Sequence, residues 1–564
     1  MLARILLALA ALAPTASAQL TTPIQSMDAI QSLFAVDDEY ALFAGDAGNG
    51  LGMELYCWRA DTGVTLLADI HPGPESSAIR RFTNAWLGGQ RVTLFAVDDA
   101  ANGSELWRTD GTAAGTFLVS DFGYGPPTLG LGISDIAYHP QAGKAFVGIT
   151  SGSDLWEGLW VTDGTAAGTV QVAPAFFPPN DLVPFGPDLF FRQGKAVHRY
   201  DPATSQVATV TGIPGGSFWE LMRVGDELAL RRSVTTAQAT MELWRIDPVT
   251  LTGSLVRDIN IGGGDEVKWI GRGEHAGELY FTAVNGAGVE RVYRSDLKTS
   301  AIQNLGLAPG QYTRFSDPGA VGSGLLLSTP ATFVGTSLVL PVHAFDTLGA
   351  GVPVDLGVES DAVGPKGFPA AHANGGVYFL GNAPGSPGGL FFTDGTVAGT
   401  TQVSPSFHVS SLQLNDLVVC DGRVLFVAPF GQSDQGLQAL TPPGAYATDL
   451  GTYEGTPRLR ATDPILGTTV RLSGEGAPAG TIGVLLWGPP PAAPVDLGTG
   501  VPLWIDTSTA SVVPGLLNPT WTMSVPLPAG PLLAGLDINL QAWFLDPQTG
   551  ALSGTNGVRL NLDF

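Results

Sequence analysis

Three near-identical stretches place an aspartate, a glycine and a threonine side by side, and such residues could do chemistry. They read WRTDGTAAGTF at 107–117, WVTDGTAAGTV at 160–170 and FFTDGTVAGTT at 391–401. The carboxylate could be a nucleophile or a calcium ligand. Asp also accepts hydrogen bonds from backbone N–H groups two residues on, Gly adopts positive φ, and Thr begins the next strand. We therefore interpret the cluster as a structural turn, with a ring of cation or sugar sites as the alternative.

The acidic loop that precedes the first of these stretches is the best candidate for a metal site. Asp98, Asp99 and Asn102 offer oxygen ligands close together, and calcium accepts such ligands in loose geometry. The loop lacks the spacing of an EF-hand or an RTX repeat, so solvated turn acids are the competing interpretation. Calcium is the one cofactor that the sequence suggests.

Established catalytic motifs are absent from the sequence. It contains no H-E-x-x-H, no G-x-S-x-G and no P-loop, and its seven histidines have no short ligand spacing. A glycosidase-like pair of carboxylates assembled from different parts of the fold would leave no trace in the spacing. An enzyme of that kind is therefore kept as an alternative.

The Asp of each cluster belongs to a repeat, and that repeat defines the elements that must position it. Eight times an aromatic residue or a histidine precedes an aspartate by three positions, and a ninth unit at 438–441 keeps the phase without either residue. Successive aspartate positions, including the ninth, are 49, 53, 38, 46, 49, 50, 48 and 47 residues apart. The eight pairs are Trp58 and Asp61, Trp107 and Asp110, Trp160 and Asp163, His198 and Asp201, Trp244 and Asp247, Tyr293 and Asp296, His343 and Asp346, and Phe391 and Asp394.

Each repeat unit predicts four short strands. Runs rich in Val, Leu, Phe and Thr alternate with Gly and Asn or Asp, which is typical of strands and hairpins. Four strands in about 40–50 residues are the signature of a β-propeller blade. Large rings at one repeated position are expected to pack between neighbouring blades. His198 and His343 occupy that position and are interpreted in the same way.

The repeat also resembles a known family. ELWRTDGTAAGTFLVSDF at 105–122 is similar to the ELWxxDGT repeat, also described as hyalin-like, of bacterial secreted proteins, with near-complete copies at 159–173 and 389–403 and a diverged one at 241–259. The resemblance covers roughly residues 30–450, and it implies a propeller but no reaction. The fourth unit is short, and the seventh and ninth depart from the pattern. We therefore expect eight or nine four-stranded blades.

A second all-β domain is expected after the repeats end. Residues 452–564 contain short apolar runs divided by Pro- and Gly-rich turns, which predicts a β-sandwich of seven or eight strands. GLDINLQAWFLDPQTG at 535–550 and the terminal GVRLNLDF resemble the C-terminal module of secreted planctomycete proteins. This resemblance implies a surface, sorting or attachment role.

The start of the chain and its charge predict where the protein acts. Arg4, an apolar run and Ala16-Ser17-Ala18 are typical of a signal peptide cleaved after residue 18, which leaves 19–451 for the propeller. No later apolar stretch is long enough for a transmembrane segment. The chain is therefore expected to be secreted, periplasmic or at the cell surface. A net charge of −24, from 27 Lys and Arg against 51 Asp and Glu, argues against nucleic-acid binding.

Two cysteines, Cys57 and Cys420, fall in the first and the ninth unit. The first and last blades of a closed ring are neighbours, so a disulfide could staple the closure. Two separate buried thiols are the alternative, which we favour slightly because alignment across blades is not given by the sequence.

The sequence as a whole predicts an exported, non-catalytic protein for binding or cell-surface interaction. We expect an extracellular carbohydrate or protein partner, held by loops that do not repeat, including 123–135 and 308–340. The alternative is a propeller hydrolase or lyase that acts on extracellular polysaccharide, and a third possibility is an architectural component of the envelope. Nothing in the sequence specifies an oligomeric state.

Overall fold

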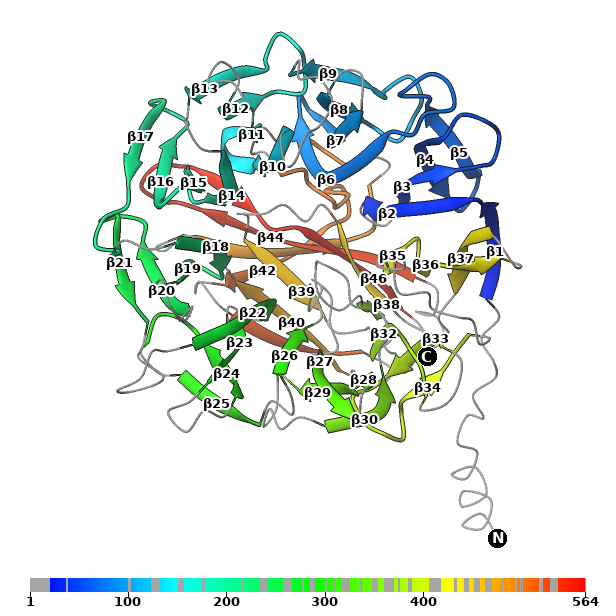
Figure 1. The fold of residues 1–564 in the computed structure, drawn as a ribbon. Coiled ribbons are helices and arrows are strands. Elements are labelled where there is room, and N and C mark those ends of the chain that lie inside the picture. Colours follow the sequence, from blue (N-terminus) through cyan, green and yellow to red (C-terminus); the bar gives the residue numbers. More distant parts are fainter. Residues whose placement is uncertain are drawn as a thin grey trace.

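Strands make up nearly all of the described chain. The computed structural model describes residues 21–562 except 37–38, 100–102, 123–131, 151–156, 175–177, 215–216, 234–240, 257–265, 276–277, 285–289, 300–301, 308–310, 316–324, 335–336, 340, 347–353, 360–369, 374–375, 384–387, 405–416, 431–433, 441–445, 451–456, 462–468, 476, 478–480, 492–493, 498, 500, 517–520 and 528–535. Within these residues, nine antiparallel sheets form a ring, and two further sheets cross the middle of the ring in the view of Figure 1. The prediction of an all-β chain with a large β-propeller is confirmed, and the described blades number nine.

The first five blades follow one another along the chain, and each is built from four consecutive strands. Their strands are β2 (Ala29–Val36), β3 (Tyr40–Asp46), β4 (Met53–Arg59) and β5 (Gly63–Ala68); β6 (Ala78–Leu87), β7 (Gln90–Asp99), β8 (Gly103–Thr109) and β9 (Phe117–Asp121); β10 (Gly132–His139), β11 (Lys144–Thr150), β12 (Gly158–Thr162) and β13 (Val170–Pro174); β14 (Pro179–Phe185), β15 (Asp188–Gln193), β16 (Ala196–Asp201) and β17 (Gln206–Thr209); and β18 (Ser217–Val224), β19 (Glu227–Ser233), β20 (Met241–Asp247) and β21 (Thr252–Leu255).

The remaining four blades complete the ring. Their strands are β22 (Glu266–His275), β23 (Glu278–Val284), β24 (Glu290–Ser295) and β25 (Ile302–Leu307); β26 (Gln311–Phe315), β27 (Leu325–Val334), β29 (Pro341–Asp346) and β30 (Val354–Glu359), with β28 (Ser337–Val339) beside β27; β31 (Ala370–Ala373), β32 (Gly376–Gly381), β33 (Gly389–Thr393) and β34 (Thr401–Gln402); and β35 (Leu417–Cys420), β36 (Arg423–Phe430) and β37 (Asp434–Leu440) with β1 (Thr21–Met27).

The N-terminal strand closes the ring. β1 pairs antiparallel with β37, from Thr21 opposite Leu440 to Met27 opposite Gln435, and is the outer strand of the ninth blade. The first blade begins directly afterwards with β2. Backbone hydrogen bonds between the two ends of the repeat region therefore hold the first and last blades together.

The region 308–340 is not a long loop as the sequence suggested. It contains β26, β27 and β28, and β26 with β27 forms the first hairpin of the seventh blade. The pattern was misread because Pro330, Ser328 and Thr329 interrupt the apolar run of this strand, and because this unit departs from the repeat. The other expected loop, 123–135, lies outside the described residues up to position 131, and β10 begins at Gly132.

Apolar residues of neighbouring blades share the cores of the ring. The strands in the middle of a blade are covered on both faces, so β3 and β32 read as continuous apolar runs and are almost wholly buried. The first strands of successive blades contact one another, as β6 does β10 and β10 does β14, so these strands surround the central axis (Figure 1). The fourth strands lie at the perimeter and are partly exposed.

Two sheets follow the ring along the chain and share one core. One sheet contains β38 (Tyr446–Leu450), β46 (Gly557–Leu562), β44 (Leu536–Leu545), β41 (Ile482–Gly488), β42 (Ser511–Leu516) and β45 (Leu552–Gly554), and the other contains β39 (Arg458–Ala461), β40 (Thr469–Glu475) and β43 (Trp521–Pro526). Leu472 of one sheet and Phe544 of the other belong to the same core. The β-sandwich of seven or eight strands stays a prediction; the described strands of this region number nine.

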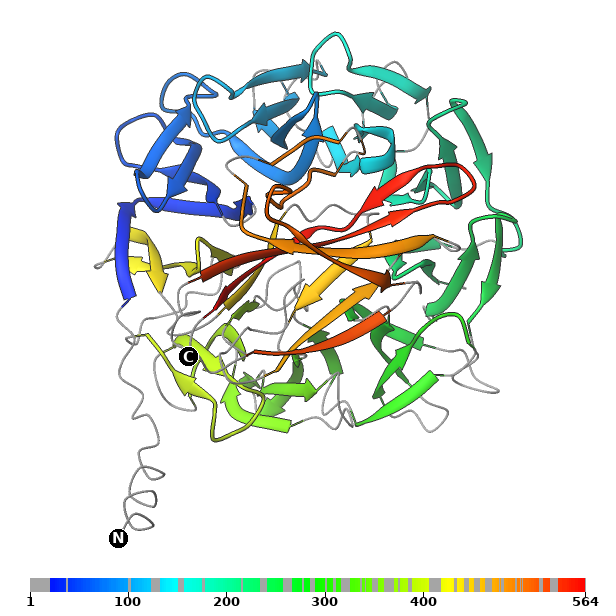
Figure 2. The same ribbon diagram turned by 180° about the vertical axis from the view of Figure 1, so that it is seen from behind.

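The alternating strand directions give the ring two different ends. The hairpins between first and second strands and between third and fourth strands lie at one end, which we call the hairpin end. The connections between second and third strands and between blades lie at the other, the crossover end. The connection between β41 and β42 contacts the hairpin end: Val501 joins a core with Trp86, and the Arg91 guanidinium lies 6.0 Å from the Trp504 ring centroid. Figure 2 shows the C-terminal sheets across the middle of the ring.

Candidate functional site

The repeated aromatic residues fill the spaces between blades. Trp160 belongs to the core between the second and third blades, and Trp244 to the core between the fourth and fifth. Trp58, Tyr293 and Phe391 are buried between blades in the same way, and Trp107 packs against the core of the first two blades. The third strand places each ring against the preceding blade.

The two histidines at this position also lie in packed surroundings. His198 stacks on Phe191 at 5.4 Å between ring centroids, and His343 is buried. Burial lowers the pKa of both imidazoles. Among the described residues, no group of three or more His, Cys, Asp or Glu side chains could hold a metal ion.

The Asp-Gly-Thr stretch of the second blade is a loop closed by its own side chains. Asp110 Oδ1 accepts hydrogen bonds from the Thr112 N–H at 3.0 Å and the Thr112 hydroxyl at 2.6 Å. Thr112 Oγ1 accepts the Gly115 N–H at 3.0 Å, and the Thr116 hydroxyl donates to the Thr112 carbonyl at 2.6 Å. Gly111 has φ +83°, as the turn interpretation requires. The next strand begins at Phe117, however, and not at Thr112.

The other two copies of this loop have the same geometry. Asp163 accepts the Thr165 N–H at 2.9 Å, and Asp394 accepts the Thr396 N–H at 2.9 Å. The glycine five positions after each Asp is required by space, because a Cβ at Gly168 would lie 2.1 Å from the Asp163 carboxylate. The sequence D-G-T-x-x-G-T thus describes one compact loop, and we call it the long loop.

The long loop also touches the preceding blade. A Cβ at Gly111 would lie 2.7 Å from both Tyr40 and Arg59 of the first blade, so glycine permits a close approach there. The Arg108 guanidinium of the second blade donates to the Gly164 carbonyl of the third blade at 3.3 Å. Arginine directly after the repeated Trp therefore contributes to the joint between blades.

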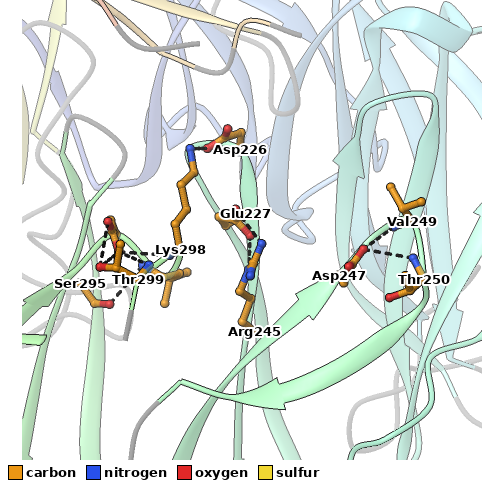
Figure 3. Close-up of polar contacts among 11 residues, drawn as sticks. Asp226, Glu227, Arg245, Asp247, Val249, Thr250, Ser295, Lys298 and Thr299 are labelled. Carbon is orange, nitrogen blue, oxygen red and sulfur yellow. Dashed lines mark hydrogen bonds and ion pairs between the residues drawn. The ribbon is translucent and has the colours of Figure 1, made fainter. Parts of the chain in front are cut away.

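Three other blades replace the long loop by a short turn. Asp247 Oδ1 accepts the N–H groups of Val249 at 2.8 Å and Thr250 at 3.1 Å (Figure 3). Asp201 and Asp296 close their turns in the same way. Figure 3 also shows that the Lys298 ammonium, beside Asp296, forms an ion pair with Asp226 on the preceding blade. Asp61 lies in the turn between β4 and β5.

The calcium candidates are only partly described. Asp98 lies on β7 and forms an ion pair with the Arg80 guanidinium, so a cation of the protein occupies one of its oxygens. The side chain of Asp99 and the whole of Asn102 lie outside the described residues. The calcium site therefore stays a prediction.

Cys57 and Cys420 are two separate thiols rather than a disulfide. Cys57 belongs to the core between the first and second blades, whereas Cys420 belongs to the core between the ninth and first blades. Trp58, the next residue, shares the core of Cys420, because successive side chains of a strand point to opposite faces. The two sulfurs therefore face opposite sides of the first blade. Burial raises the pKa of Cys57 to about 11.

Sequence reasoning missed a set of polar side chains on the first strands. Each of these strands has an irregularity in pairing near the crossover end, and a polar residue lies inside it or directly after it in each of the first five blades. We call the place of this residue the bulge position, and it holds Ser32, Arg81, Asp135, Asp181 and Glu220. A signal was present in the sequence: the first three of these residues lie 28 or 29 positions before the repeat Asp of their blade.

Side chains at the bulge position clamp neighbouring blades together. Asp135 accepts the N–H of Leu182 on the next blade at 2.8 Å, and Asp181 accepts the N–H of Leu221 on the blade after that at 2.9 Å. The Ser32 hydroxyl donates to the Ile79 carbonyl of the second blade at 3.2 Å. These bonds join the first strands that surround the axis.

Electrostatics at the bulge position are dominated by burial and mixed charge. Burial raises the pKa of Asp135, while the Leu182 N–H and the Arg81 charge act in the opposite direction. The charge of Asp181 acts with burial. Asp181 also accepts a hydrogen bond from the Arg192 guanidinium at 2.8 Å. The crossover end thus carries carboxylates and guanidinium groups close together.

No helix among the described residues is long and apolar enough to cross a membrane.

Comparisons with known proteins find likeness at the level of solved structures alone. No family model and no curated protein matches the chain. Dipeptidyl peptidase 4 from Porphyromonas gingivalis is 10% identical, with a TM-score of 0.40 over 70% of this chain and 64% of that one. A prolyl endopeptidase is 10% identical (TM-score 0.37, 80% and 55%), and a puromycin-hydrolyzing peptidase from Mycobacterium tuberculosis is 14% identical (0.35, 80% and 63%). The chain thus spans less than two thirds of each of these structures, and similarity this low says nothing about what it binds.

Proposed function

We propose that this chain is an exported, non-catalytic protein that binds an extracellular carbohydrate or protein partner through the crossover end of its propeller. The observation that carries the proposal is the use of acids at the bulge position. Asp135 and Asp181 each accept a hydrogen bond from a backbone N–H of the next blade, so both carboxylates help to hold the blades of the propeller together. Carboxylates held in this way fix neighbouring blades, and the surface that these blades form, in place. They are poorly placed to exchange protons with a substrate.

The position of the C-terminal sheets supports the choice of end. The connection between β41 and β42 reaches the hairpin end through Val501 and Trp504, and a side chain of β44 holds this connection in place. The Gln541 amide donates to the Pro502 carbonyl at 2.8 Å, and its oxygen accepts the Trp504 N–H at 3.1 Å. A partner therefore has freer access to the crossover end. In this proposal the C-terminal region serves attachment or sorting.

A polysaccharide hydrolase or lyase is the second candidate, and one observation favours it. Asp135 has a raised pKa caused chiefly by burial, and the charges of Asp181 and Arg81 act on it. A general acid requires a carboxyl group that holds its proton more tightly than usual, and a second carboxylate nearby is what a glycosidase pairs with it. An enzyme of this kind would place its chemistry at the bulge position.

One experiment separates the two candidates. The full mature chain is applied to a glycan array with and without calcium, and the bound polysaccharides are then incubated with the protein and assayed for new reducing ends. We expect binding without cleavage, and the same binding after calcium is chelated. New reducing ends that disappear in Asp135→Asn but persist in Asp110→Asn would establish the enzyme instead.

A further inference from the structure

Arg81 departs from the pattern of the bulge position. In the first, third and fourth blades the side chain there bonds to the following blade, through Ser32, Asp135 and Asp181. In the second blade that bond is made two residues later, where the Thr83 hydroxyl donates to the Ile136 carbonyl of the third blade at 3.1 Å. The hydrogen bond that joins the blades therefore does not involve the arginine, whose charge acts on the buried Asp135 of the third blade.

The Arg81 residue is exposed, and no hydrogen bond to a described neighbour holds its guanidinium. It forms no hydrogen bond or ion pair with any described residue, in contrast to the adjacent Arg80. Arg80 pairs with Asp98 and donates to the Ile133 carbonyl at 2.8 Å. The Arg81 backbone has φ +60°, a conformation that costs energy for a residue with a side chain. Ser32 and Asp181 share this conformation, so the fold imposes the cost and the arginine occupies a position already held rigid.

The charges around Arg81 restrict what it can bind. The opposite charges that act on it are those of Asp135 and Asp98, and Arg80 contributes a like charge. A doubly charged anion such as a phosphate monoester would be repelled by the two carboxylates. A singly charged carboxylate matches the planar guanidinium in two parallel hydrogen bonds, and sugar hydroxyls can donate to the carboxylate oxygens nearby.

We infer that Arg81 binds the carboxylate of an acidic sugar, so that the crossover end of the propeller recognises uronic-acid-containing polysaccharide. This rests on the proposed binding function and names its ligand class. A protein of net charge −24 repels polyanions in general, so retention of a polyuronate requires a specific cation such as this one. Acidic sugars are therefore selected by a local site on an otherwise unfavourable surface.

The test is affinity electrophoresis of the full mature chain, which measures how strongly polygalacturonate, neutral dextran or dextran sulfate in the gel retards the protein. We expect retention by polygalacturonate, and a loss of affinity of about tenfold or more in Arg81→Gln. Lys144→Gln, which removes an exposed positive charge at the hairpin end of the third blade, is the matched control and should bind as the unchanged chain does. Arg81→Gly suits the left-handed backbone, so it should fold and show the same loss.

The outcomes distinguish the inference from the proposed function. Equal retention of Arg81→Gln and the unchanged chain in polygalacturonate would overturn the inference. Retention by dextran that Arg81→Gln leaves intact, without retention by polygalacturonate, would overturn it while sustaining a binding function. Stronger retention by dextran sulfate than by polygalacturonate would assign the site to sulfate esters and refute the acidic sugar. A chain that binds nothing on the array or in the gels would refute both.

Discussion

Two kinds of loop follow the repeated aspartate. One depends only on residues close to it in the chain, and the other also depends on contact with another blade. In the second, third and eighth blades the long loop folds back on the Asp, and in the second and third it also touches the preceding blade. In the fourth, fifth and sixth blades the short turn closes within four residues, and in the sixth a side chain, Lys298, makes the contact between blades. The Asp is common to both because it closes a hairpin.

The same short turn occurs outside the ring. Asp546 Oδ1 accepts the Gln548 N–H at 2.8 Å, and its Oδ2 accepts the Thr549 hydroxyl at 2.7 Å. The residue four after the Asp is left-handed in both places, with φ +73° at Gly550 and +57° at Ser205. The Asp turn thus depends on the chain within a few residues. The glycines of the long loop depend on a second feature, the close approach to the carboxylate and to the preceding blade.

Loss of the repeated aromatic residue should lower the free energy of unfolding most. The size of this effect should not depend on the type of loop that follows the residue. Trp160 precedes a long loop and Trp244 a short turn, and each is 8% exposed. We expect Trp160→Ala and Trp244→Ala each to lower the free energy of unfolding by about 3–5 kcal/mol, because each leaves a cavity between blades. Urea unfolding monitored by circular dichroism measures this. Trp487→Ala, at a site 42% exposed, is the control and should cost much less. A large difference between the first two variants would contradict the common role.

Adding a methyl group inside the long loop should have the next largest effect on stability. A Cβ at Gly115 would lie 2.1 Å from the Asp110 carboxylate, so Gly115→Ala should destabilise the chain by about 1–3 kcal/mol. Removing that carboxylate in the double variant Asp110→Ala/Gly115→Ala should recover part of the loss, which thermal unfolding can measure. Strictly additive losses would show that the glycine is needed for another reason.

The contact between blades should be stronger through the long loop than through the short turn. Arg108→Gln removes a charged donor to the Gly164 carbonyl and should cost about 1 kcal/mol. Lys298→Gln breaks an exposed ion pair with Asp226 and should cost about 0.5 kcal/mol or less, decreasing further in high salt. Thermal unfolding at two salt concentrations compares the variants. A larger loss for Lys298→Gln would reverse the comparison.

The smallest effect should be a pH dependence of the short turn. The N–H groups of Thr250 and Val249 lower the pKa of Asp247 below its ordinary value of 3.8. The turn's contribution to stability is therefore complete above that value and is lost as pH falls through the lower pKa of the folded state. Asp247→Asn should weaken the fall in stability between about pH 4 and pH 2. A chemical-shift titration of the Asp247 carboxyl provides a direct check, and a midpoint above 3.8 would contradict this account.

Much of the fold could be predicted from the sequence because its determinants lie within one repeat. The aromatic residue or histidine and the Asp are three positions apart and recur eight times. The period, the four strands per blade and the turn could therefore be predicted. The seventh blade was misread because Pro330 lies within β27 and that unit departs from the repeat. Trp58 could be assigned to a space between blades, but the face occupied by Cys57 could not.

The candidate site was largely hidden in the sequence. Arg81 and Asp135 are 54 residues apart, on strands that carry no repeated motif, and they become neighbours because adjacent blades present their first strands to the same axis. The irregular pairing of each of those strands with the second strand of its own blade bears on which side chain clamps and which stays exposed.

The sequence by itself determined the all-β class, the period, the aromatic residues between blades and the Asp turns, because each depends on residues close together in the chain. Tertiary structure alone decided three other features. β1 closes the ring by pairing with β37, the connection between β41 and β42 reaches the hairpin end, and Thr83 takes over the clamp that leaves Arg81 exposed. These depend on how separate strands meet, and strand pairing across several hundred residues is fixed by packing and register rather than by any local pattern.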